Sequence, residues 1–298
     1  MSDAFETFRG LRQVYEFPTR SGTIQTLAPR VKLFWSTERI ERTPALPDQS
    51  IVIMISGRKT AHLDGTRIDY DRDNYLVVSM PVPFECASDA SERDPLLGVS
   101  IDIDLPALTR FANIPGAVPP QAPEEPTFLP PGLQPAPVDT GLSDAAQRLV
   151  RTLHSPSDTL ALGTSLADEI VYRALKGTHG AALLSLTKPS SQHARIARAI
   201  LTIHRDPART LAVDELAAVA GMSVRSFHRA FKAATYRTPL QYIKIVRLSM
   251  AMNLLQGGTR EVGTVARHVG YESGSQFSRE FKRHFRMTPA EVKVRRQS

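Results

Sequence analysis

Two segments of the chain repeat one pattern of serine, phenylalanine and basic residues. The segments GMSVRSFHRAFK (221–232) and GYESGSQFSREFK (270–282) share S-x-x-x-F-x-R-x-F-K, with every shared residue fifty positions apart. At 100° per residue on a helix, the phenylalanines oppose a polar arc. The arc of the first copy is Arg225, His228, Arg229 and Lys232, and that of the second is Ser275, Ser278, Arg279 and Lys282. Each copy therefore predicts a helix with a buried aromatic side and an exposed polar side.

The polar arcs carry side chains that read nucleic acid. An arginine guanidinium can donate two hydrogen bonds to O6 and N7 of guanine in the major groove, and serine and glutamine contact base edges less selectively. A single basic residue on a helix is often only solvated, but the arginine recurs here at a matching helix position. We therefore predict that Arg229 and Arg279 contact bases, and that Lys232 and Lys282 contact the DNA backbone.

Each repeated segment follows a short helical pattern and a turn. The first copy runs VDELAAVA, GM and a helix capped by Ser223, and the second runs EVGTVARHV, GYE and a helix capped by Ser273. A serine at an N-cap accepts a hydrogen bond from a free backbone N–H. Ala217 and Ala266 are small enough to let the paired helices approach closely. This order predicts two helix-turn-helix motifs, at about 211–233 and 260–283.

The helix LQYIKIVRLSMAMNLLQ (240–256) joins the two motifs. One recognition helix covers only a few base pairs, so two of them on one chain can read a longer site. A rigid connection would place them about one DNA turn, roughly 34 Å, apart in adjacent major grooves.

The charge of the chain is divided unevenly. Residues 191–298 contain 19 Lys and Arg against 7 Asp and Glu, whereas the other 190 residues contain 18 against 23. A strongly basic part beside an acidic one indicates that only the basic part faces a polyanion. Double-stranded DNA is the leading candidate. A membrane surface would instead require an amphipathic basic helix flanked by apolar anchors.

The region before the basic part is predicted to be β structure. Residues 24–104 contain several short apolar or alternating stretches, with an Asp64-Gly65 hairpin signal between two of them. Short strands with frequent turns and no helical pattern between them indicate a sandwich or a barrel. We expect a regulatory domain over residues 1–138.

A proline-rich connection and two helical stripes follow. Residues 115–137 contain nine prolines, which predicts either a flexible linker or an extended strap held on the β domain by Phe128 and Leu129. The helical patterns within 139–187 have apolar stripes that can pack on the β domain or pair with a second copy of the chain. We expect a mixture of both, with 139–187 acting as a dimerisation segment, and a DNA-binding domain over 190–298.

At these residues the chain resembles a known family. The stretches LAVDELAAVAGMSVRSFHRAFKAATYRTPLQYIKIVRL and VARHVGYESGSQFSREFKRHFRMTP are similar to the DNA-binding domain of AraC/XylS-type transcription regulators. The stretches ISGRKTAHLDGTRIDYDRDNYLVVSMPVPFECA, LLGVSIDIDL and LADEIVYRALKG bear a weaker resemblance to the family branch with an N-terminal cupin-like barrel. The resemblance implies an α+β protein, with an effector-sensing antiparallel barrel, appended dimerisation helices and an all-α DNA reader.

The family's base contacts fall on residues of both recognition helices. By matching helix positions they are Arg225, His228 and Arg229 in the first, and Ser275, Gln276 and Arg279 in the second. Family members often have glycine after each recognition helix, where this chain has Tyr236 and Arg286. Because neither residue favours positive φ, we expect a different local geometry there, with Arg286 reaching phosphate. Gly274 replaces a longer polar residue, so we expect the first helix to dominate specificity.

Candidate effector contacts are few. Trp35, Arg58, Lys59 and Tyr75 could line a pocket, although packing or surface exposure explains each equally well. The β region has one histidine, His62, and no clustered metal ligands, so we expect neither a metal, a cofactor nor catalysis. The alternatives to a sequence-specific regulator are a nonspecific architectural DNA-binding protein and a cupin-type enzyme fused to a DNA-binding module.

The remaining features concern location and partners. No apolar run approaches the ~20 residues that span a bilayer, no secretory signal pattern occurs, and Cys86 is the single cysteine. These features favour a cytoplasmic protein, and the family resemblance implies a bacterial one associated with the nucleoid. The expected partners are promoter DNA, a small-molecule effector, a second copy of the chain and, if the protein is an activator, RNA polymerase.

Overall fold

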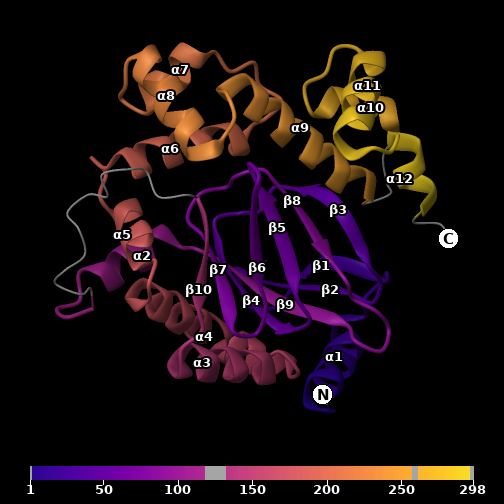
Figure 1. Ribbon diagram of the computed structural model, residues 1–298, viewed down its shortest axis with the longest axis vertical. Coiled ribbons are helices and arrows are strands. Elements are labelled where there is room, and N and C mark those ends of the chain that lie inside the picture. The colour runs from indigo at the N-terminus through magenta and orange to yellow at the C-terminus, as the bar shows by residue number, and fades with distance from the viewer. Residues whose placement is uncertain (1, 118–131, 257–260, 296–298) are drawn as a thin grey trace.

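Two antiparallel sheets form the first half of the protein (Figure 1). The computed structural model describes residues 2–117, 132–256 and 261–295. The larger sheet contains β1 (Ser21–Gln25), β2 (Val31–Ser36), β9 (Leu96–Asp102), β4 (Ser50–Ser56), β7 (Asn74–Val78) and β10 (Leu133–Pro137), in that spatial order. The smaller contains β3 (Ile40–Ala45), β8 (Phe84–Ser88), β5 (Lys59–Leu63) and β6 (Thr66–Tyr70). The predicted α+β class and the many short strands are confirmed.

The Asp64-Gly65 turn connects β5 and β6 as predicted. Leu63 pairs with Thr66, and the two turn residues have positive φ angles of 47° and 84°. Two consecutive left-handed residues give the turn a twist that matches the flanking strands. The hairpin therefore fixes the register of β5 against β6.

The two sheets form an open sandwich rather than the closed barrel that the family resemblance implies. Each described sheet has an edge strand that contains proline: Pro44 in β3, and Pro135 and Pro137 in β10. Proline has no N–H to donate to a further strand, so it is tolerated at edges and disfavours closure. Apolar side chains fill the space between the sheets, including Met54, Leu76, Val78 and Leu96.

The proline-rich connection ends as an edge strand. Its residues 118–131, which include Phe128 and Leu129, lie outside the described residues. The last part is β10, which pairs antiparallel with β7 and buries Leu133 and Ala136. The end of this segment is thus part of the sheet, which is closer to the predicted strap than to a flexible linker.

Five helices accompany the sheets. They are α1 (Ser2–Tyr15), α2 (Leu105–Ala112), α3 (Thr140–Thr152), α4 (Pro156–Lys176) and α5 (Gly180–Thr187). The apolar stripes of α3 and α4 are buried in one cluster with side chains of the six-stranded sheet, such as Val31 and Ile51. Leu149 and Ile170 are fully buried there. Of the two destinations considered for the stripes, the structure shows packing on the sheet.

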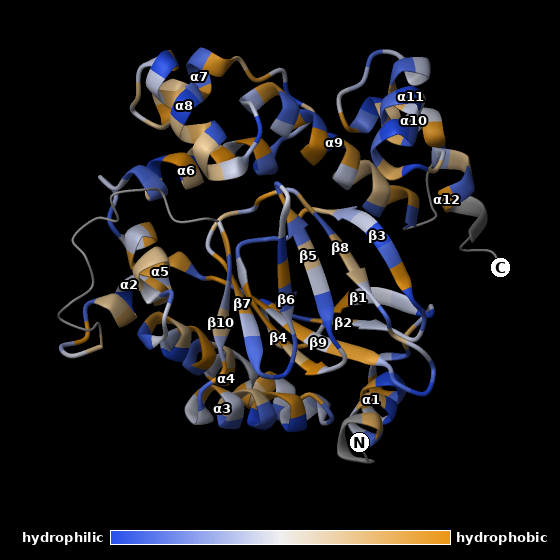
Figure 2. Cartoon of the chain, in the orientation of Figure 1, coloured by the Kyte–Doolittle hydropathy of each residue, from blue (hydrophilic) through white to orange (hydrophobic). Residues whose placement is uncertain are grey.

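The described residues of the second half form seven helices, arranged as two units joined by one helix. The first unit comprises α6 (Gln192–Arg205), α7 (Val213–Val219) and α8 (Val224–Thr235), and the second comprises α10 (Val262–His268), α11 (Gly274–Phe285) and α12 (Pro289–Arg295). The helix α9 (Pro239–Gln256) bridges them, and each unit has its own apolar core (Figure 1). Hydrophobic residues recur along the length of α9 (Figure 2), because it contributes to both cores.

The first helical unit packs directly on the sheets. Met80, just after β7, is fully buried in the core of that unit. Tyr242 of α9 is also fully buried, and its hydroxyl donates to the carbonyl oxygen of Pro81 at 2.8 Å. The His204 Nε2 atom lies 2.8 Å from the same hydroxyl. These contacts fix the first unit against the β7–β8 connection.

Candidate nucleic-acid interface

The two repeated segments form two helix-turn-helix motifs of the same construction. The Ser223 hydroxyl accepts from the Ser226 N–H at the start of α8, and the Ser273 hydroxyl accepts from the Gln276 N–H at the start of α11, both at 3.3 Å. Before each cap, a glycine with positive φ turns the chain: Gly221 at 60° and Gly270 at 83°. Both predicted N-caps are confirmed. The local sequence thus explains where each recognition helix begins.

The repeated phenylalanines are core residues, as predicted. Phe227, Phe231, Phe277 and Phe281 are all fully buried. Within each helix the two rings lie near each other, with centroids 5.3 Å apart in α8 and 5.5 Å apart in α11. Aromatic pairs at such distances pack favourably in tilted arrangements. These buried rings fix the rotation of each helix about its axis, so the opposite side of the helix is exposed to solvent.

The polar arcs are exposed on both helices. The side chains of Arg225, His228, Arg229 and Lys232 on α8, and of Ser275, Gln276, Arg279 and Lys282 on α11, all lie at the surface. In the described part of the chain, no carboxylate pairs with the arginines and lysines of these arcs. Unpaired surface cations remain free to contact phosphates or base edges. The structure therefore presents all eight predicted residues, four from each unit.

Two polar residues of the second arc already have partners within α11. The Gln276 Nε2 atom donates to Glu280 at 3.2 Å, and the Ser275 hydroxyl lies 2.9 Å from that of Ser273. The longer side chains of Arg225 and His228 occupy the corresponding part of α8. The second helix thus offers shorter and partly engaged groups, in keeping with the prediction that the first helix dominates specificity.

The expected disturbance of the C-caps is wrong. Tyr236 and Arg286 both adopt the left-handed conformation, with φ of 57° and 59°, and each donates its N–H to a lysine carbonyl one turn earlier. A left-handed C-cap satisfies an otherwise free carbonyl of the last turn. In this conformation the Cβ atom of a non-glycine residue lies too close to a backbone carbonyl oxygen, which is unfavourable. Tyr236 also packs against the inter-sheet core, whereas Arg286 is exposed.

A half-buried carboxylate organises the second unit. Glu280 accepts from Lys244 of α9 at 3.1 Å and from the Tyr271 hydroxyl at 2.9 Å. Burial would raise the pKa of Glu280, but hydrogen bonds from Gln276, Lys244 and Tyr271 hold it below its ordinary value. Burial and the neighbouring carboxylate raise the pKa of Tyr271. Glu280 is therefore ionised at neutral pH and connects α9 to α11.

Two arginines of this region were not anticipated from the sequence. The Arg195 Nε atom in α6 donates to the carbonyl oxygen of Ala220, next to the first turn glycine, at 2.6 Å. Arg247 in α9 donates to the carbonyl oxygen of Gly270, the second turn glycine, at 3.1 Å. The two arginines are 52 positions apart, not fifty, so the repeat does not align them and extending it upstream would not have found them.

The predicted effector residues do not converge. Trp35 is stacked on Phe17 with ring centroids 4.0 Å apart. Tyr75 is buried in the same apolar cluster, which also contains side chains of α3 and α4. Lys59 lies 5.0 Å from the Phe34 ring, within reach of the inter-sheet core. Successive residues of a strand point to opposite faces of the sheet, so the neighbours Arg58 and Lys59 face different surroundings. Arg58 alone of the four lines a described cavity.

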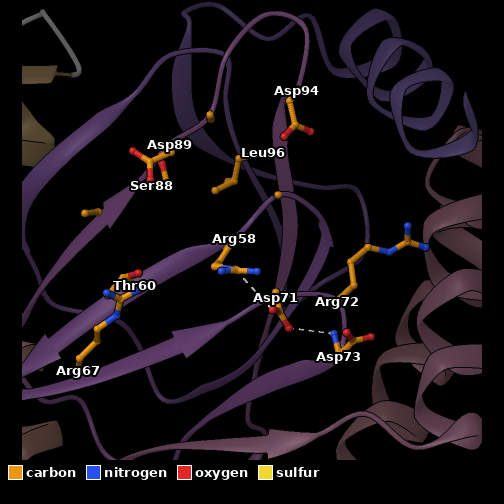
Figure 3. Close-up of a pocket in the computed structure, with 13 residues that line it drawn as sticks. Arg58, Thr60, Arg67, Asp71, Arg72, Asp73, Ser88, Asp89, Asp94 and Leu96 are labelled. Carbon is orange, nitrogen blue, oxygen red and sulfur yellow. Dashed lines mark hydrogen bonds and ion pairs between the residues drawn. The ribbon is translucent and has the colours of Figure 1, made fainter. Parts of the chain in front are cut away.

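That cavity lies where three connections of the sheets meet (Figure 3). It has a volume of about 500 Å³ and takes residues from the β4–β5, β6–β7 and β8–β9 connections. Arg58 extends towards Asp71, with 3.6 Å between the Arg58 Nε and Asp71 Oδ2 atoms. Ser88 also lines the cavity, and its buried hydroxyl has no hydrogen-bond partner. Its mixed charges suit a small polar molecule.

Neither a metal centre nor a membrane helix is present in the part of the chain that the structure describes. No group of three or more His, Cys, Asp or Glu side chains there could hold a metal ion. No helix among those residues is both long and apolar enough to cross a bilayer.

The fold and the two motifs define a helix-turn-helix protein with an N-terminal β sandwich. The family description "AraC-type transcriptional regulator N-terminus" matches residues 27–182, and "Helix-turn-helix domain" matches residues 216–295. The chain therefore belongs to the AraC-type family of transcription regulators, as its resemblance to AraC/XylS regulators implied.

Individual relatives match part of the chain. The HTH-type transcriptional regulator AlkR of Acinetobacter baylyi is 34% identical over 97 residues, which cover 33% of this chain and 32% of AlkR. ArgR of Pseudomonas aeruginosa is 26% identical over 149 residues, covering 50% of this chain and 45% of ArgR. The chain thus spans about a third of the length of the first curated relatives it matches.

Solved structures of ToxT of Vibrio cholerae are similar over almost the whole chain. ToxT of Vibrio cholerae with a bound unsaturated fatty acid superposes with a TM-score of 0.59 over 93% of this chain and 96% of ToxT. The identity is 10%, so this likeness concerns the fold.

Proposed function

We propose that this chain is a sequence-specific, double-stranded DNA-binding transcription regulator. The observation that carries the proposal is the pair of exposed polar arcs on α8 and α11, whose arginines and lysines have no carboxylate partner among the described residues. Arg225, His228, Arg229, Ser275, Gln276 and Arg279 contact base edges, and Lys232 and Lys282 contact phosphates. The two helices enter successive major grooves on one face of the DNA.

The proposed domain division follows the predicted boundaries. Residues 1–138 form the regulatory domain, 139–187 the helical segment, and 190–298 the DNA-binding domain. The apolar clusters support the boundary near residue 190, since most of the DNA-binding helices have clusters of their own, whereas α3 and α4 share one cluster with the larger sheet. We assign the protein to the bacterial cytoplasm, near the nucleoid, without a catalytic role or a cofactor.

The sheets sense a small-molecule effector in this proposal. The mixed-charge cavity beside Arg58 supports this role, because a few convergent polar groups are typical of sites for small polar ligands. Contacts at Met80 and Pro81 connect the sheets to the DNA-binding helices. The protein acts at promoters, and an activating mode would include contact with RNA polymerase.

The protein acts as a homodimer in this proposal, through the segment 139–187. The inner stripes of α3 and α4 are occupied by the sheet, so the outer side of α4 remains for a second copy. Leu160 and Leu162 of α4 are 67% and 52% exposed, and they flank its buried stripe on different sides. Sedimentation of the full chain at tens of micromolar tests the dimer, and a strict monomer would contradict it.

The DNA-binding proposal is tested by selection from a pool of random duplexes with the full chain. We expect a two-part site with its halves about one helical turn, roughly 10 base pairs, apart. Binding should weaken steeply with salt, because basic contacts release counterions from DNA. Enrichment of no sequence above the starting pool would contradict specific binding and favour an architectural role.

A chromosome-wide binding map should follow, because the genes beside the bound sites indicate the effector and the regulatory sign. Its expected result is a limited set of promoter sites that contain the selected sequence. Uniform occupancy along the chromosome would overturn the regulatory proposal.

A further inference from the structure

Arg247 lies in the middle of α9 and donates hydrogen bonds to both helix-turn-helix units. Its Nε atom contacts the carbonyl oxygen of Pro207 at 2.7 Å, and its Nη2 atom contacts those of Arg209 at 3.2 Å and Ala208 at 3.4 Å. Its Nη1 atom contacts the carbonyl oxygen of Gly270 at 3.1 Å. One side chain therefore engages four backbone carbonyls.

Those carbonyls belong to two segments far apart in sequence. Residues 207–209 form the connection between α6 and α7 in the first unit, and Gly270 is the turn glycine of the second motif. The two segments are in direct contact at this point, because a Cβ atom on Gly270 would lie 2.6 Å from the Ala208 carbonyl oxygen. Arg247 thus closes the gap where the two units meet.

Arginine has the right shape for this position. Its planar guanidinium presents five donors in a fixed fork, so it can hold several acceptors in one geometry. The cation also offsets the repulsion between carbonyl oxygens that converge on it. A lysine could donate from a single nitrogen only, and an apolar residue could not donate at all.

A second set of contacts supports the same arrangement. Lys244, one turn before Arg247 on α9, pairs with Glu280 of α11, and Tyr271 donates to the same carboxylate. The second recognition helix is therefore held to α9 through Glu280, while the turn before it is held through Arg247.

Arg195 provides a comparison within the same molecule. It donates to the carbonyl oxygen of Ala220 beside the first turn glycine, and its guanidinium lies near Gly221. Both partners belong to the first unit. Arg195 therefore supports a single motif, whereas Arg247 supports its motif and also connects it to the other.

We propose that Arg247 is a positioning residue that sets the spacing of α8 and α11, so that the protein accepts a two-part DNA site with one fixed separation between its halves. This inference rests on the proposed DNA-binding function. One inserted base pair rotates the second half-site by roughly 35° and moves it by about 3.4 Å. A rigid pair of helices cannot follow that displacement, whereas a hinged pair can.

The test uses the full chain and fluorescence anisotropy with four duplexes. They are the site selected by the wild-type protein, the same site with one base pair inserted or deleted between its halves, and a duplex carrying only the half-site read by α8. For the wild-type chain, we expect an insertion or deletion to weaken binding at least about 30-fold, since several base contacts are lost together.

The variant Arg247→Met keeps the length of the side chain and removes its donors. We expect about tenfold weaker binding to the selected site, an insertion penalty below about threefold, and unchanged binding to the half-site. The control Arg195→Met should weaken binding to the half-site and to the selected site, and keep the insertion penalty of the wild-type chain.

The outcomes separate this inference from the proposed function. An unchanged insertion penalty in Arg247→Met, or a wild-type chain that tolerates the insertion, would overturn the role of Arg247. Failure of the wild-type chain to prefer the half-site over random DNA would instead contradict the proposed function. If Arg247→Met does not fold, Arg247→Lys replaces it, since lysine retains the charge and a single donor nitrogen. Its insertion penalty should lie between the wild-type value and the value of below about threefold expected for Arg247→Met. A penalty equal to the wild-type value contradicts the inference.

Discussion

Arg229 and Lys232 occupy neighbouring positions on the exposed side of α8, yet they suit different parts of DNA. A guanidinium can recognise a guanine edge with two directed hydrogen bonds, whereas an ammonium is a compact charge that suits phosphate. Phe227 and Phe231 hold the helix so that both cations remain outside. The chemistry at this scale depends on which side chain occupies each exposed position.

Replacing Arg229 should therefore affect specificity, and replacing Lys232 should affect affinity alone. We expect Arg229→Ala to weaken binding to the selected site by about 1–3 kcal/mol and to relax the preference at one base step. Lys232→Ala should weaken all sequences alike and reduce the salt slope by about 1. Binding curves on the selected site and its single-base variants measure both effects. An Arg229→Ala curve identical to that of the wild-type chain would remove the base-contact assignment.

At the scale of the element, the two recognition helices end in the same strained way. Tyr236 and Arg286 both have positive φ angles, where glycine avoids the steric clash of a Cβ atom. The two residues differ in their surroundings. Tyr236 packs against the inter-sheet core and so has a reason to be retained, whereas Arg286 is exposed after α11.

This difference predicts opposite results for the same substitution. Arg286→Gly should raise the free energy of unfolding by up to about 1 kcal/mol, because relief of strain exceeds the added flexibility of the unfolded chain. Tyr236→Gly should lower it, because the lost packing of the ring outweighs the relieved strain. Chemical unfolding of the two variants beside the wild-type chain measures both changes. A gain for Tyr236→Gly would show that its contact with the sheets contributes little.

At the scale of the whole molecule, two histidines of α6 lie where the sheets and the DNA-binding helices meet, one buried and one half-buried. His193 and His204 both belong to α6, and burial lowers the pKa of His193 to about 4 and lowers that of His204 as well. Asp48 opposes the shift at His204, and the backbone of Ser79 opposes it at His193. Both imidazoles are therefore neutral in the folded protein near pH 7, and charging them opposes the packed arrangement.

Acid should weaken the folded state for this reason. The pKa of His193 in the folded protein lies below its unfolded value of about 6.5. The stability that depends on neutral His193 is therefore fully present above pH 6.5 and is lost as the pH falls towards 4. We expect the free energy of unfolding to fall by about 2 kcal/mol between pH 7 and pH 5 from this residue. His193→Asn should flatten the profile. Equal profiles for the wild-type chain and His193→Asn would contradict the prediction.

The sequence by itself determined the features that depend on local chemistry. Repetition and period placed Ser223 and Ser273 at caps, Phe227 and Phe277 in the core and the basic arcs outside, because caps and amphipathic faces follow from residues a few positions apart. The Asp64-Gly65 hairpin was determined in the same way. Such features require no knowledge of distant segments.

Only the tertiary structure decided which distant segments meet. It separated Trp35 and Tyr75 from Arg58, because strand alternation and sheet order decide which face a side chain occupies. It left the sandwich open, since Pro44, Pro135 and Pro137 lie on edge strands. It also brought the α6–α7 connection against Gly270, with Arg247 between them. Contacts between residues so far apart in the chain depend on how whole elements pack, which local pattern does not encode.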